Sequence, residues 1–161
     1  LLDTIPGVGR EAAQVIVSEI GIDMSRFPSA ANLSAWAGVA PGNNESAGKH
    51  RSGKTRKGNS SLETVLIQSA HAAAHTKNTY LAAQYHRLAG RRGVKKAAVA
   101  VAHSILVISY YLIKRHEPYK ELGADYFDNR NLEATSKRLV NRLEYLGFQV
   151  TLNPIQALLA I

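Results

Sequence analysis

The chain has 161 residues, no cysteine and a formal net charge of +8. This length can bury the core of one ordinary domain, and the absence of cysteine excludes disulfides and thiolate zinc sites. The charge is concentrated, because eleven Lys or Arg residues and a single acid, Glu63, lie between Ser46 and Ser104. Clustering of this kind indicates a polyanionic partner, either a nucleic acid or an acidic membrane surface.

The first 21 residues have the form of a helix-hairpin-helix element. The turn PGVG, at residues 6–9, precedes a helix predicted from Glu11 to Ile20 and ended by Gly21. Glycines permit backbone conformations closed to other residues, and amides at a helix start can face a phosphate oxygen. The alternative is an ordinary glycine turn before a helix. If the element binds DNA, the sequence-independent contacts come from Gly7, Val8, Gly9 and Arg10.

Four further helices are predicted from apolar spacings of three and four residues. The second of these begins after Asn59 or Ser60, either of which can cap it. Between Gly38 and Gly58 the periodicity vanishes, which predicts a long unstructured basic loop, and residues 90–93 read as a basic turn. The four helices cover Ser29 or Ala30 to Ala37, Ser60 to about His75, Asn78 to Ala89, and Val94 to Arg115.

The apolar run from Ala97 to Ile113 raises the question of a membrane span. It is marginally short for a bilayer, and it contains the polar residues His103, Ser104 and Ser109. A helix buried in a core or a dimer interface explains the run better. No membrane partner is therefore expected.

Beyond Pro118 one more helix is predicted, with an apolar face and an end at Gly147. Residues 148–152 alternate like a short strand, which would pair with another chain or remain extended. The expected fold class is mainly α and multi-helical, with one domain at 1–116 and a helical tail or oligomerisation appendage at 117–161. No secretory pattern follows Leu1, so the chain reads as a fragment. The apolar face comprises Leu132, Leu139, Leu143 and Leu146.

Three segments, taken together and in order, carry a resemblance to a known family. They are PGVG, then AWAGVAPGNNESAGKHRSGKTRKGNSSL, then YHRLAGRRGVKKAAVAVAHSILVISYYLI. They resemble the carboxy-terminal domain of the IS-one-ten family of bacterial insertion-sequence transposases, relatives of the Piv site-specific invertase. The resemblance covers Leu1 to about Arg115. It implies DNA as the substrate, a structured guide RNA, a homo-oligomer and a place in the bacterial cytoplasm, at the nucleoid.

The resemblance also implies how the chemistry is divided between domains. Family members carry an amino-terminal RuvC-like domain whose four acidic residues bind a divalent metal such as Mg²⁺. Only the second domain is represented here, so no cofactor or metal site is expected in this chain. His71 and His75 have a spacing compatible with zinc, but no third ligand is evident, and a structural role is expected for both.

The family's essential serine corresponds to Ser46, in the segment ESAGK. Its implied role is attack on a DNA phosphodiester to form a phosphoserine intermediate. By their positions in the sequence, Lys49 and Arg51, like the later cations of the loop, could stabilise the phosphoryl oxygens. His50 is a weaker candidate for proton transfer. Ala47 stands where the family usually has glycine, and Glu63 where it tends to have arginine. From pattern alone, a loop serine that caps a turn is the simpler interpretation, and Ser52, Ser60 and Ser61 are competitors.

The remaining cations form two groups that are expected to contact a DNA backbone, although a solvated basic surface explains each of them too. Tyr85 and His86 could stack on bases, but aromatic residues at helical spacing more often belong to a core. Two hypotheses for function remain: a transposase fragment that cuts DNA through Ser46, and a non-catalytic helix-hairpin-helix DNA-binding module. The first group is Lys54, Arg56 and Lys57, and the second is Arg91, Arg92, Lys95 and Lys96, with Arg87 beside it.

Overall fold

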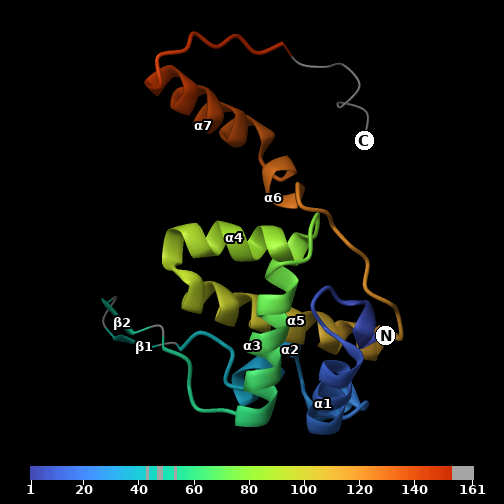
Figure 1. The fold of residues 1–161 in the computed structure, drawn as a ribbon. Helices are drawn as coiled ribbons and strands as arrows, with labels where there is room; N and C mark the ends of the chain where they lie inside the picture. The colour runs from blue at the N-terminus through green and yellow to red at the C-terminus, as the bar shows by residue number, and fades with distance from the viewer. Residues whose placement is uncertain (43, 47–48, 53, 154–161) are drawn as a thin grey trace. The chain divides into compact units, whose positions relative to one another are not determined.

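A computed structural model describes residues 1–42, 44–46, 49–52 and 54–153, with the backbone alone for 44–46 and 49–52. The chain divides into two compact units, Leu1–Asp125 and Tyr126–Ile161. In the first unit, short 3₁₀ turns at Leu2–Thr4 (η1) and Met24–Arg26 (η2) accompany five α-helices and a two-stranded hairpin (Figure 1). Its helices and strands are α1 Arg10–Ile20, α2 Ala30–Trp36, β1 Asn44–Ser46, β2 Lys49–Ser52, α3 Ser60–Ala74, α4 Tyr80–Arg92 and α5 Val94–Arg115.

Helix α5 is the centre of the first unit, where α2, α3 and α4 pack against it. Its apolar run is long enough to cross a membrane by composition, yet half of that stretch is buried inside the unit, as in a core helix. The side chains of Val101, Ile105 and Leu106 are fully buried there. The core is completed from the other helices by Ile16, Ile20, Leu33, Leu62, Leu66 and Leu81.

Side-chain caps fix where three of the helices begin. Ser29 Oγ accepts from the Asn32 amide before α2, Asn59 Oδ1 from Leu62 before α3, and Thr79 Oγ1 from Ala82 before α4. Asn59 is therefore the cap of α3, one of the two residues predicted for it. Helix α4 starts later than predicted, because Asn78 has a positive φ of 57° and stands outside the helix.

Two predictions about the connections differ from the structure. The basic loop contains a short antiparallel hairpin, in which Glu45 pairs with His50 and Ser46 with Lys49. So short a ladder leaves little room for an alternating apolar pattern. Residues 90–92, predicted as a turn, form the end of α4, and the break comes at Gly93, whose φ of 87° favours glycine.

The first unit extends to Asp125 because an extended strap, residues 117–123, crosses α5 after the helix ends. The amide of Tyr119 donates to Thr4 Oγ1 over 2.9 Å, which ties the strap to the amino-terminal turn. Glu121 Oε1 accepts from the Tyr80 amide at 2.7 Å and so caps α4 from a distant part of the sequence. The strap thus connects the start of the chain with the start of α4.

The second unit holds α6, Tyr126–Asn129, and α7, Leu132–Tyr145. None of its described residues is buried, and Leu132, Leu139, Leu143 and Leu146 are all exposed. Gly147, with φ at 90°, ends α7 as predicted. No strand forms in the described part of the chain beyond it, and pairing of residues 148–152 with another chain stays a prediction.

Candidate nucleic-acid interface

The basic loop is closed at its base by two glycines. Gly38, with a φ of 80°, and Gly58 lie so close that a Cβ on Gly58 would overlap the backbone of Ala37 and Gly38. Further along, a Cβ on Gly42 would overlap the Lys54 carbonyl. The two sides of the loop therefore run against each other, backbone to backbone. This glycine clasp, formed by Gly38 and Gly58, fixes where the hairpin leaves the helical core.

A side-chain contact anchors the same base to α1. Asn59 Nδ2 donates to Glu19 Oε2 over 2.6 Å, while Asn59 Oδ1 caps α3. Both residues are partly buried, so the bond is shielded from competing water. Sequence reasoning did not single out Glu19 for this role, because its partner lies 40 positions away. A capping asparagine directly after a basic loop was the one signal available.

The hairpin brings the three predicted catalytic residues onto one short element. Its register pairs Ser46, at the end of β1, with Lys49, at the start of β2, and Arg51 lies further along β2. In Figure 1 the hairpin stands out from the helices. The departure from the family at Ala47 falls outside the described residues. The structure thus places the backbones of Ser46 and Lys49 opposite each other, with Arg51 two residues further along β2.

The remaining cations of the loop follow the hairpin. Lys54, Arg56 and Lys57 are all exposed, and they precede the glycine clasp at Gly58. The structure places Arg56 next to Gly38, because a Cβ on Gly38 would lie 3.0 Å from the Arg56 carbonyl. These cations thus lie between the hairpin and the glycine clasp, where a polyanion that reached the hairpin would also meet them.

The predicted second basic group comes together across Gly93. Arg91 and Arg92 are exposed in the last turn of α4, and Lys95 and Lys96 are exposed in the first turn of α5. Cations in a first turn oppose the positive end of the helix dipole, and α5 has no acid there to compensate. A bound anion would relieve this repulsion. The arrangement therefore favours contact with phosphates over a solvated basic surface that binds nothing.

Replacing both Lys95 and Lys96 by glutamine should raise stability and lower DNA affinity together. Removing the unfavourable dipole interaction should raise the Tm by about 2–5 °C. Each lost phosphate contact should reduce the salt dependence of binding by about one unit of slope. Lys114→Gln is the matched control, because Lys114 lies in the last turn of the same helix, where a cation is favourable. A fall in Tm for the double variant would contradict the prediction.

In the amino-terminal turn, the four predicted DNA contacts separate into two pairs. Val8 is buried and its amide donates to the Ile5 carbonyl over 3.0 Å. Gly7, with φ at 83°, packs so closely on α3 that a Cβ would overlap the backbone at Ser69 and Ala73. Gly9 and Arg10 are exposed at the start of α1. Gly9 and Arg10 are therefore the pair that a DNA backbone could reach.

Of the aromatic and histidine candidates of α3 and α4, Tyr85 is buried, whereas His71, His75 and His86 are exposed. Tyr85 is buried and its hydroxyl lies 3.2 Å from His71 Nδ1, while His86 Nε2 lies 2.9 Å from the Ala74 carbonyl. These contacts agree with the expected structural roles. Among the described residues no group of three His, Asp or Glu could hold a metal ion.

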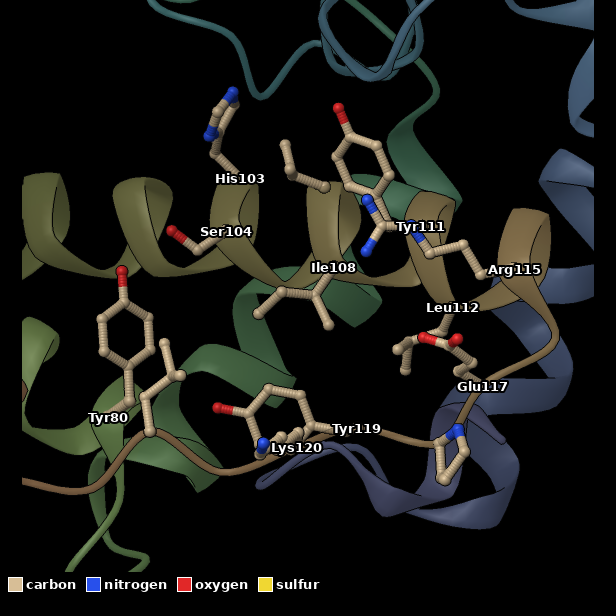
Figure 2. A pocket seen from close by; sticks show the side chains of 13 residues that line it. Tyr80, His103, Ser104, Ile108, Tyr111, Leu112, Arg115, Glu117, Tyr119 and Lys120 are labelled. Carbon is tan, nitrogen blue, oxygen red and sulfur yellow. The ribbon is translucent and has the colours of Figure 1, made fainter.

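An apolar pocket of about 520 Å³ opens between α5 and the strap, which sequence reasoning did not foresee (Figure 2). Tyr80, Ile108, Leu112 and Tyr119 line it. Burial lowers the pKa of His103 at its edge, so the imidazole is neutral at neutral pH. Burial, and next the nearby Glu121 carboxylate, raise the pKa of the Tyr119 phenol. Three charged residues, Arg115, Glu117 and Lys120, also line the pocket, which lies outside the predicted site, and we assign it no catalytic role.

The comparison with protein families decides the identity of the chain. The model described as Transposase IS116/IS110/IS902 family matches residues 1–87, which include the amino-terminal turn, the hairpin and the glycine clasp. The chain belongs to this transposase family. The second basic group, at residues 91–96, lies beyond the matched range.

Individual relatives of this transposase chain agree with the family assignment. The chain is 33% identical over 123 residues to the "Transposase for insertion sequence element IS1111A" of Coxiella burnetii, which covers 74% of the chain and 34% of the relative. It is 29% identical over 122 residues to the "Pilin gene-inverting protein" of Moraxella bovis, covering 74% and 38%. The chain thus spans about a third of the length of the curated relatives it matches.

Proposed function

We propose that this chain is the DNA-contacting, serine-bearing part of a bacterial transposase or site-specific recombinase. The observation that carries the proposal is the hairpin, held by the glycine clasp inside the range of the family match, with Ser46 opposite Lys49. The named relatives act in transposition and in gene inversion, and both processes break and rejoin DNA.

The chemistry proposed for Ser46 balances without an external energy source. The hydroxyl oxygen attacks a backbone phosphorus, the serine proton goes to a base, and one P–O bond of the strand breaks, so that the sugar hydroxyl leaves. The phosphoserine conserves the bond energy, and attack by a second sugar hydroxyl rejoins a strand and frees Ser46. Lys49 and Arg51 stabilise the charge on the phosphoryl oxygens during both transfers.

Other partners complete the proposal. The divalent metal, expected to be Mg²⁺, would be bound by residues of a RuvC-like domain outside this chain. A structured guide RNA, a homo-oligomer and a place at the bacterial nucleoid are the other expectations. The decisive test of the nucleophile is a covalent adduct between Ser46 and DNA, trapped with a suicide substrate and located by mass spectrometry.

Binding of the chain to duplex DNA should depend steeply on salt. The candidate phosphate contacts release counterions when they bind, so affinity should fall by about 10³-fold or more as salt rises from about 50 to 200 mM. Fluorescence anisotropy of a labelled duplex with no chosen sequence measures this slope. A flat salt response would count against DNA as the partner. The contacts are Arg10, Lys54, Arg56, Lys57, Arg91, Arg92, Lys95 and Lys96.

A further inference from the structure

We propose that Trp36 stacks on an unpaired DNA base at the base of the loop, beside the glycine clasp. This inference rests on the proposed function, and it adds that the DNA at this site is locally single-stranded or opened. Trp36 is the last residue of α2 and the one tryptophan of the chain. Its side chain is 44% exposed, whereas Leu33 and Ala37 beside it are fully buried. A rigid backbone therefore holds a large aromatic ring in the solvent.

The ring of Trp36 is supported from one side. The Phe27 ring lies 5.6 Å from it, centroid to centroid, with the two planes tilted by 54°. Phe27 is itself partly buried against the core, and its carbonyl accepts from the Tyr110 hydroxyl of α5 over 3.2 Å. An indole that is braced in this way loses little conformational entropy when a flat ligand stacks on it. Trp36 thus has the properties of a stacking platform.

Two cations whose backbones lie near that of Trp36 favour a nucleic acid as its ligand. Gly38, two residues after Trp36, lies against the Arg56 backbone, and exposed Arg26 directly precedes the Phe27 that braces the ring. Proteins that bind single strands combine such cations, which follow the phosphates, with aromatic rings on which bases stack. A base inside a duplex is covered on both faces by its neighbours. The ligand face that Trp36 requires is therefore that of an unpaired base.

The single tryptophan makes the test direct. Oligothymidylate, which forms no duplex, should quench the intrinsic fluorescence of the 161-residue chain when the indole is excited selectively. Trp36→Ala should weaken oligothymidylate binding by about 5- to 100-fold and leave binding to a duplex of equal length nearly unchanged. Trp36→Phe, which keeps an aromatic ring, should weaken oligothymidylate binding by less than Trp36→Ala does. Anisotropy of labelled DNA gives the affinities, and circular dichroism checks the fold of each variant.

Tyr111 offers a matched control, because it is an aromatic residue of nearly equal exposure, 42%, on α5 (Figure 2). Tyr111→Ala should leave oligothymidylate binding unchanged. Oligothymidylate binding without quenching, equal losses for Trp36→Ala and Tyr111→Ala, or tighter binding of oligouridylate than of oligothymidylate would each overturn the inference. If Trp36→Ala does not fold, quenching of the unaltered chain and the affinity of Trp36→Phe decide. If the chain bound duplex DNA in a salt-dependent way but showed neither quenching nor a loss of affinity in Trp36→Ala, this inference alone would be wrong. If the chain bound no DNA at all, the proposed function would be wrong too.

Discussion

Replacing Ser46 by alanine in the full-length transposase should abolish strand exchange and leave DNA binding intact. The substitution removes the oxygen that is proposed to become covalently joined to the phosphate, so the phosphoserine intermediate cannot form at this position. Loss of a nucleophile from a catalytic group that acts as a unit costs about 10⁴-fold or more, which would bring recombination to the background of the assay. Binding should change little, because the proposed phosphate contacts come from the cations. Recombination of a paired donor and target, with affinity measured in parallel, tests both statements.

Ser52→Ala is the matched control for this experiment. Ser52 belongs to the same hairpin, where it pairs with Asn44 at the end far from the turn. Its variant should therefore form the covalent adduct and recombine at close to the normal rate. If Ser46→Ala recombined normally, or if the adduct mapped to Ser52, the role proposed for Ser46 would be wrong. If neither the unaltered protein nor Ser52→Ala formed an adduct, the non-catalytic binding module would be favoured.

The helices could be predicted because their signals are local. Helices α1, α3 and α5 show apolar spacings of three and four, and the capping residue Asn59 fixes the start of α3. Local signals failed at the end of α4, where Gly90 reads as a breaker. In the structure Gly90 is part of helix α4, and the chain turns at Gly93, which has a positive φ. A glycine tolerated inside a helix and a glycine that ends one look alike in sequence.

The arrangement of the candidate site could not be predicted in the same way. The resemblance supplied Ser46, and the positions of Lys49 and Arg51 in the basic loop made them candidates, but neither gave the register that pairs Ser46 with Lys49. The contact of Asn59 with Glu19 joins residues 40 positions apart, and that of Tyr119 with Thr4 joins residues 115 positions apart. An extended strap has no helical period, and a single long-range hydrogen bond leaves no pattern. Such contacts become visible only when the tertiary structure brings their partners together.

The glycine clasp is one such long-range contact, and it leads to a second prediction with a large expected effect. Gly58→Ala should lower the free energy of unfolding by about 1–3 kcal/mol, because the added methyl group has no space against the backbone of Ala37 and Gly38. The Tm should fall by about 2–4 °C for each kcal/mol lost. Moving the two sides of the loop apart should also displace the hairpin relative to the core, so the full-length variant should recombine more slowly even at temperatures where it is folded. Calorimetry and the recombination assay below the Tm measure the two effects.

Gly90→Ala separates the clasp from a general effect of glycine replacement. Gly90 lies within α4, and a Cβ there would meet nothing within 4 Å. Alanine should therefore stabilise the chain by about 0.5–1 kcal/mol, since it restricts the unfolded chain more than glycine does. The two substitutions add the same methyl group and should change stability in opposite directions. If Gly58→Ala matched Gly90→Ala in both Tm and recombination rate, the close approach of Gly38 and Gly58 would not hold the loop, and the position of Ser46 would have to depend on other contacts.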